Sequence, residues 1–180
     1  MSHNRKLLNI ELGRVSAEEY RKLPESGIVV VLDNIRSAHN VGSIFRSSDS
    51  FKVDKVYLCG ICSVPPSAEI HKSALGAEDS VEWEHYDRTV DAVARLRDEG
   101  YSIVSVEQTV DSVPLDRLAA EPGGRYALVF GNEVDGVSQD VVDASCFSVE
   151  IPQFGTKHSL NVSVSAGIVL WHFRYLSCLR

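Results

Sequence analysis

The chain has 180 residues, a net charge of −7 and a pI of about 5.3. This length suits one domain with a buried core, and the acidic balance excludes a protein that coats nucleic acid nonspecifically. No stretch reaches the roughly 18 apolar residues that a membrane-spanning helix needs, and the polar N-terminus has no apolar signal core. We therefore expect a cytoplasmic protein with no membrane segment.

Strands and helices are expected to alternate along the chain. A polar lead-in contains one short helix at residues 17–22. The β-branched or alternating runs expected as strands are residues 28–34, 55–60, 80–86, 101–108, 125–133 and 146–153. The segments expected to hold helices are residues 41–51, 63–79, 88–100, 114–121, 138–145 and 161–179. This alternation is typical of an α/β domain with a mainly parallel sheet.

Residue types at several helix ends predict how those helices begin. We expect Asp87 and Ser138 to cap the helices that follow them, and Pro114 to open a short helix at its first turn. The last helix is apolar nearly all round, so it should be buried on most sides. In a chain this short, a subunit interface is a reasonable place to bury it.

Two cysteines have CxxC spacing but lack the context of a metal or redox site. Cys59 and Cys62 end an apolar strand, whereas a redox pair would open a helix, and no second pair follows them. We expect both to be small core residues, and we expect no metal site.

Three polar, glycine-containing clusters follow predicted strands, at residues 32–46, 129–138 and 151–167. Open parallel sheets bind ligands at the carboxyl ends of their strands, so these clusters are the candidate site. A dinucleotide fold would need G-x-G-x-x-G after the first strand, but the first cluster has the single Gly42, and no P-loop is present. We therefore set aside NAD and ATP sites.

The same clusters resemble the three motifs of the SpoU/TrmH branch of the SPOUT methyltransferases. They read NVGSIFR (40–46), LVFGNEVDGV (128–137) and IPQFGTKHSLNVSVSAG (151–167), in the order of the family. The resemblance implies an α/β fold with a mainly parallel sheet, flanking helices and a deep C-terminal trefoil knot. It also implies an N-terminal extension (1–27) in place of the RNA-binding domain that the family often carries, followed by a catalytic domain (28–180).

The resemblance further implies the cofactor, the partners and the reaction. The cofactor is S-adenosyl-L-methionine, two subunits of a homodimer form the active sites together, and the substrate is RNA, either tRNA or rRNA. The reaction is methyl transfer to a ribose 2′-hydroxyl. The alternatives are a noncatalytic RNA-binding protein that kept the fold, and methylation of a base or a small molecule.

Five residues of the motifs are implied to be catalytic, and Arg46 is the most important of them. Its high pKa makes it a difficult general base, and a guanidinium fork that holds a phosphate and polarises the hydroxyl is physically easier. Its role is left open. The other four also have simpler interpretations. Asn40 could be a helix N-cap and Glu133 a surface carboxylate, whereas Ser159 and Asn161 could be an N-cap and a first-turn residue of the last helix.

Four residues are implied to bind the cofactor. Gly131 is expected to let the backbone approach the cofactor closely, and Ile151 and Leu160 are expected to flank the adenine, although apolar residues also pack in cores. Glu107 ends a neighbouring strand. Outside the motifs, the expected RNA contacts are His71, Lys72 and His158. We expect Trp83 and Trp171 in the core or at an interface rather than as platforms on which bases stack.

Overall fold

The computed structural model describes residues 4–13, 15–119, 121 and 123–178. Its centre is a parallel seven-stranded sheet in the order β3-β2-β1-β6-β4-β7-β5. The strands are β1 (Ile28–Asp33), β2 (Lys55–Cys59), β3 (Glu82–Tyr86), β4 (Ser102–Val106), β5 (Val113–Pro114), β6 (Tyr126–Gly131) and β7 (Phe147–Glu150). The predicted α/β class with a parallel sheet is confirmed, whereas the trefoil knot stays a prediction.

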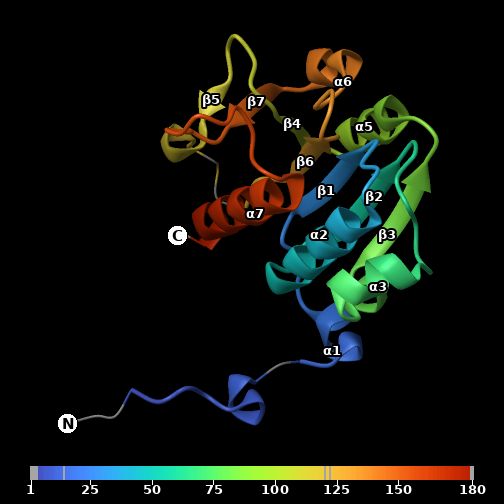
Figure 1. Ribbon diagram of the computed structural model, residues 1–180, viewed down its shortest axis with the longest axis vertical. Helices are drawn as coiled ribbons and strands as arrows, with labels where there is room; N and C mark the ends of the chain where they lie inside the picture. Colours follow the sequence, from blue (N-terminus) through green and yellow to red (C-terminus); the bar gives the residue numbers. More distant parts are fainter. Residues whose placement is uncertain (1–3, 14, 120, 122, 179–180) are drawn as a thin grey trace.

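Helices cover both faces of this sheet (Figure 1). Side chains of β1 alternate between two cores: Val30 and Leu32 pack with α2, α3 and α7, whereas Val29 and Val31 pack with α5 and α6. The helices are α1 (Ala17–Lys22), α2 (Ala38–Ser50), α3 (Ala68–Ala74), α4 (Ala77–Ser80), α5 (Thr89–Asp98), α6 (Gln139–Ala144) and α7 (Val162–Cys178), with 3-10 turns η1 (Asn9–Leu12) and η2 (Leu115–Arg117). Figure 1 shows α3, α2 and α7 in a row on one face.

The start of α2 differs from the prediction. The helix begins at Ala38, and its N-cap is Ser37, whose hydroxyl accepts a hydrogen bond from the backbone N–H of Asn40 at 3.2 Å. The interpretation of Asn40 as the cap is therefore wrong, and its side chain is available for other contacts. Gly42 of the same motif packs against α3, where an added Cβ would lie 2.2 Å from the Ser73 hydroxyl and 2.4 Å from the Ile70 carbonyl oxygen.

Three other expected helix features are wrong. The segment 63–79 forms two helices, α3 and α4, because Leu75 and Gly76 adopt left-handed backbone conformations with φ of 54° and 90°. Arg88, not Asp87, occupies the N-cap position of α5. The expected helix at 114–121 is instead the end of β5 followed by the short η2 turn, because Pro114 lies in an edge strand that pairs with β7.

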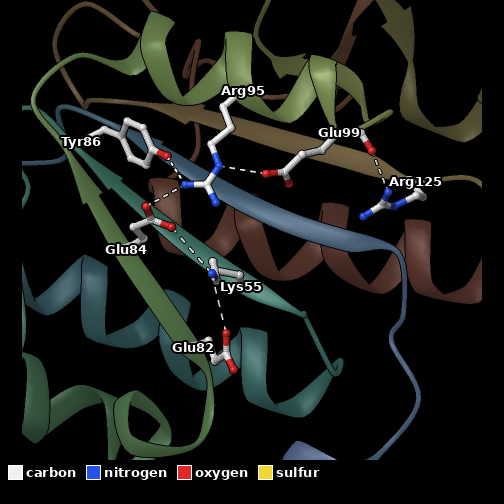
Figure 2. A network of polar contacts seen from close by, with 7 residues as sticks. All are labelled: Lys55, Glu82, Glu84, Tyr86, Arg95, Glu99 and Arg125. Carbon is white, nitrogen blue, oxygen red and sulfur yellow. Dashed lines mark hydrogen bonds and ion pairs between the residues drawn. The ribbon is translucent and has the colours of Figure 1, made fainter.

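The opposite edge strand, β3, carries a network of charges on its exposed side (Figure 2). Lys55 lies 3.7 Å from both Glu82 and Glu84, and Arg95 of α5 bonds Glu84 and Glu99 at 2.8 Å each. These side chains are partly exposed, so each pair adds little stability. Charges along an edge strand hinder pairing with a strand of another molecule. We assign this protective role to the network.

The chain before β1 is only partly joined to the domain. Tyr20 of α1 is 7% exposed and belongs to the core, whereas the segment before α1 runs away from the domain in Figure 1. Within the described residues, no helix is long and apolar enough to cross a membrane.

The cysteine pair is buried in the core, as expected. Burial raises the pKa of Cys62 to about 11 and that of Cys59 to about 12, so both are neutral thiols at physiological pH. The Cys62 sulfur accepts a hydrogen bond from the Ile35 backbone N–H at 3.1 Å. Across the described part of the chain, no group of three or more His, Cys, Asp or Glu side chains is arranged to hold a metal ion.

Candidate functional site

A cavity of about 500 Å³ opens at the carboxyl edge of the sheet. Its walls come from the ends of β4, β6 and β7, which are neighbours in the sheet, and from the segment that leads into α7. This is the edge at which open parallel sheets bind ligands, and the volume suits a molecule of cofactor size. The predicted site residues that line it are Glu107, Gly131, Glu133, Ile151, Ser159, Leu160 and Asn161.

The lining of the cavity is acidic. It includes the carboxylates of Glu107, Glu133, Asp135 and Glu150, and none of its described lining residues is Lys, Arg or His. A ligand rich in phosphates would meet repulsion here, whereas a ligand with positive charge is favoured. The structure thus gives a physical reason, beyond the missing glycine motif, to exclude NAD and ATP.

Asn40 joins the second and third motifs at the edge of the cavity. Its side-chain Nδ2 donates to Glu133 Oε1 at 2.5 Å, and its Oδ1 accepts a hydrogen bond from Asn161 Nδ2 at 3.2 Å. Asn40 is only 7% exposed, whereas Glu133 and Asn161 are exposed, so Asn40 orients one oxygen of the Glu133 carboxylate from the protein side of the cavity rim. Three of the predicted catalytic residues therefore form one hydrogen-bonded chain.

Asn161 also starts the last helix. Its Oδ1 accepts hydrogen bonds from the Ser163 backbone N–H at 2.9 Å and the Ser163 hydroxyl at 2.7 Å, which is the chemistry of a helix cap. Ser159 lies two residues before this cap and lines the cavity as an exposed residue. Asn161 is therefore the residue that caps α7, and Ser159 lies outside the helix.

The loop after β6 folds tightly back on itself. Asn132 and Gly136 exchange two backbone hydrogen bonds at 3.1 and 3.0 Å, and the Asn132 Oδ1 accepts from the backbone N–H groups of Val134 and Asp135. A Cβ on Gly131 would lie 1.9 Å from the Gly136 carbonyl carbon. Gly131 is therefore required by the loop itself, which differs from the expected reason of close approach by the cofactor.

Glu107 holds this loop from the neighbouring strand. Its Oε2 accepts a hydrogen bond from the Val137 backbone N–H at 2.9 Å, and its Oε1 accepts from the Gln108 backbone N–H at 2.8 Å. Glu107 thus lines the cavity and also positions the loop that forms one wall of it.

Asp33 is a positioning residue that the sequence analysis missed. It is 1% exposed at the end of β1, and its Oδ2 accepts from both the backbone N–H and the hydroxyl of Ser138 at 2.8 and 2.7 Å. Its Oδ1 accepts from Thr89 at 2.5 Å and from Asn34 at 2.9 Å. The signal in the sequence was a carboxylate at the end of an otherwise apolar strand, because a buried charge needs partners.

Replacing Asp33 by asparagine is expected to lower the free energy of unfolding by about 1–3 kcal/mol, because the amide turns a donor toward groups that are themselves donors. Denaturant unfolding monitored by circular dichroism measures the change. The control is Asp98→Asn, the same substitution at an exposed position near the end of α5. Equal stability of the two variants would show that the Asp33 contacts do not hold the loop.

Arg46 is the one predicted catalytic residue that lies apart from the group. It is exposed on α2, and it is not among the residues that line the cavity. On the helix it shares the outward side with His39, Ser43 and Ser50, which are exposed or half-buried. A single chain thus brings Asn40, Glu133, Ser159 and Asn161 together, and leaves Arg46 facing outward.

The fold and the cavity define a class of protein, namely a parallel α/β domain with an acidic cofactor-sized site at its carboxyl edge. The sequence profile described as the SpoU rRNA methylase family matches residues 27–171. The chain belongs to this family.

Individual relatives agree with this assignment. The chain is 35% identical to the 23S rRNA (guanosine-2′-O-)-methyltransferase RlmB of Nitrosomonas europaea, over 83% of this chain and 56% of the relative, and 32% identical to that of Neisseria meningitidis, over 88% and 62%. The crystal structure of the A. aeolicus TrmH/SpoU tRNA modifying enzyme superposes with a TM-score of 0.77 at 27% identity, covering 89% of this chain and 81% of that one.

A relative has also been solved with a cofactor. The AdoMet-bound rRNA methyltransferase from Sinorhizobium meliloti superposes with a TM-score of 0.77 at 25% identity, over 87% of this chain and 59% of that one. The chain spans less than two thirds of the length of the two RlmB relatives.

Proposed function

We propose that this protein is an S-adenosyl-L-methionine-dependent methyltransferase that acts on a ribose 2′-hydroxyl of RNA, either tRNA or rRNA. The observation that carries the proposal is the acidic cavity with the Asn40–Glu133–Asn161 chain at its edge. S-adenosylmethionine carries a sulfonium and an ammonium, which suit carboxylate walls. Relatives named as 2′-O-methyltransferases, and one solved with this cofactor, support the same reaction.

The residues that hold the cofactor lie at the ends of β4, β6 and β7 and in the segment that leads into α7. Half-buried Ile151 and Leu160, which is 39% exposed, offer apolar surface for the adenine. Gly131 and Glu107 keep the β6 loop in the shape that forms the opposite wall. When bound, the cofactor supplies an activated methyl group on a positively charged sulfur.

The protein has to position the hydroxyl and ease the loss of its proton. Glu133, oriented by Asn40, is a carboxylate at the rim of the cavity; we propose that it orients the substrate together with Ser159 and Asn161. Arg46 binds the phosphate next to the reacting ribose and polarises the hydroxyl. We assign this machinery to residues 28–180, with residues 1–27 as an N-terminal extension, in an enzyme of the cytoplasm.

We propose that the active unit is a homodimer built on α7. Val169 and Phe173 of this helix are at most 1% exposed and pack within the chain. The opposite side exposes Val164, Ile168, Trp171 and Tyr175, by 50%, 37%, 55% and 51%. Their spacing of four, three and four residues makes one continuous apolar stripe, and Trp171 and Tyr175 stack with ring centroids 5.4 Å apart. A second copy of the chain covers this stripe.

Replacing Ile168 by glutamate is expected to convert the dimer to monomers, because a charge in an apolar interface would be buried without a partner. Val169 is unsuitable for this test since it lies in the core of its own chain. The control is Val110→Glu, at a fully exposed position away from α7. Light scattering measures the mass of each variant. A parent protein that is monomeric and active would contradict the dimer.

The test of the activity is nucleoside mass spectrometry. RNA from cells that lack the protein is digested before and after incubation with the purified protein and S-adenosylmethionine. We expect the gain of one 2′-O-methylnucleoside, and no gain in the presence of S-adenosylhomocysteine. A methylated base would favour the base methyltransferase alternative. RNA binding without any methylation would favour the noncatalytic one.

A further inference from the structure

A second cavity, of about 570 Å³, lies at the other end of the sheet. It is lined by the proline turn before α3, by α3 and α4, and by Trp83 of the edge strand β3. None of its described lining residues belongs to the first cavity. The two cavities belong to different parts of the sheet, because three strands (β2, β1 and β6) separate β3 from β4.

The second cavity contains a buried carboxylate with one oxygen unpartnered. The Glu78 side chain is 7% exposed, and its Oε1 lies 2.6 Å from His71 Nδ1. Its Oε2 is buried and has no hydrogen-bond partner. An acceptor left in this state is costly, and an N–H donor from a ligand would lower that cost if the carboxylate turned this oxygen toward the cavity.

Flat groups line the same cavity as this carboxylate. Trp83 is 36% exposed, so it does not lie in the core, one of the two places expected for it, and the exposed Pro66 is also in the lining. Arg21 donates a hydrogen bond to the backbone oxygen of Asp79, another lining residue. A planar ring can stack on this surface with its polar edge toward Glu78.

We propose that this cavity binds an unpaired nucleobase of the RNA substrate, one that carries an exocyclic amino group, so that the base stacks on Trp83 and donates to Glu78. Proteins commonly read splayed-out RNA bases by stacking and by hydrogen bonds to the base edge, and carboxylates accept from such amino groups. The proposal rests on the proposed function, since that function supplies the RNA.

The helices beside the second cavity also carry exposed cationic groups. In Figure 1, α2 lies next to α3, which lines this cavity. Arg46 is exposed on α2, and Lys72 is exposed on α3. RNA that reaches the second cavity therefore meets positive charge on these two helices, although the protein as a whole is acidic.

The first test measures base preference in the parent protein. The chain has two tryptophans, so ¹⁵N-labelled indole signals in an NMR spectrum are assigned by comparison with Trp83→Phe. Titration with the four nucleoside 5′-monophosphates should shift the Trp83 signal with AMP, GMP and CMP, and least with UMP, which has no amino group. No shift with any nucleotide, or an equal shift with UMP, would overturn the proposal.

The second test uses Glu78→Gln and Trp83→Leu, with Glu69→Gln as the matched control on an exposed glutamate of α3. The probes are unmodified transcripts of a tRNA and of a 23S rRNA fragment. For whichever transcript the parent binds, each cavity variant should raise the Kd at least about fivefold, the effect of losing one stacked base. The affinity for S-adenosylmethionine should not change.

The outcomes of this test separate the two proposals. If both variants fold and bind RNA within twofold of the parent while methylation continues, the nucleobase site is wrong and the proposed function stands. If the parent binds neither transcript and methylates no RNA, the proposed function is wrong, and the nucleotide titration alone then decides whether the cavity recognises a base. If Glu69→Gln weakens RNA binding as much as Glu78→Gln, the effect is one of surface charge and the nucleobase site is wrong.

Discussion

Arg46→Ala is expected to slow methyl transfer by about a hundredfold or more while leaving the affinity for S-adenosylmethionine unchanged. Arg46 does not line the cavity of its own chain, so the variant leaves all residues that line that cavity unchanged. In the proposed mechanism the guanidinium acts on the hydroxyl as charge shifts in the transition state, and the loss of one such contact typically costs about 2–4 kcal/mol. Arg46→Lys should not restore the rate, because an ammonium cannot reproduce the planar fork.

Single-turnover methylation of the RNA substrate, with cofactor affinity measured by calorimetry, checks this result. The control is Arg88→Ala, an exposed arginine at the start of α5 on the opposite face of the sheet. Normal rates of methyl transfer in Arg46→Ala would mean that a group other than Arg46 stabilises the transition state. Loss of cofactor binding in Arg46→Ala would mean that Arg46 contacts the cofactor, so the proposed role at the hydroxyl would be wrong.

An experiment with mixed dimers can test whether Arg46 acts at the cavity of its own chain or at that of the partner subunit. Because Arg46 faces outward from its own chain, we expect it to act at the cavity of the partner subunit. A mixture of Arg46→Ala chains with chains whose cavity is disabled should then regain activity, since one intact cavity meets one intact arginine. A mixture that stays inactive, although the mixed dimers form, would place Arg46 at its own cavity.

Gly131→Ala is expected to weaken cofactor binding by about a hundredfold or more and to destabilise the fold. The added Cβ would lie 1.9 Å from the Gly136 carbonyl carbon and 2.0 Å from the Val137 backbone nitrogen. Since these are backbone atoms, the whole loop must move, and with it the Glu107 and Asp33 contacts that fix Val137 and Ser138. For the same reason, a bulky residue such as tryptophan here would disrupt the loop and would not simply fill the cavity.

Calorimetry with S-adenosylmethionine and thermal unfolding measure the two effects. The matched control is Gly155→Ala in the third motif, where an added Cβ meets nothing within 4 Å. This control should bind the cofactor as the parent does. If both glycine variants behave alike, the β6 loop does not form the wall of the cofactor site.

Local sequence patterns were enough to predict the class of fold and the edge of the sheet at which the candidate cavity lies. Alternating strand and helix patterns predict a parallel sheet, and the carboxyl ends of parallel strands share one edge. The polar residues after the strands therefore had to meet there, as Gly131, Ile151 and Asn161 do. Periodicity also predicted the apolar last helix, though not which of its sides is covered.

The contacts between these residues could not be predicted from the sequence, because they form between segments that are far apart along the chain. The Asn40 contacts with Glu133 and Asn161 span 93 and 121 residues of sequence, and no local pattern encodes such distances. In the sequence, Asp33 is only the last residue of a strand. In the fold, Ser138 and Thr89 each donate a hydrogen bond to one of its two carboxylate oxygens. Gly131 was expected to allow close approach of the cofactor, but packing against the backbone of its own loop explains it. Burial and hydrogen bonding depend on neighbours in space, which the order of strands in the sheet sets.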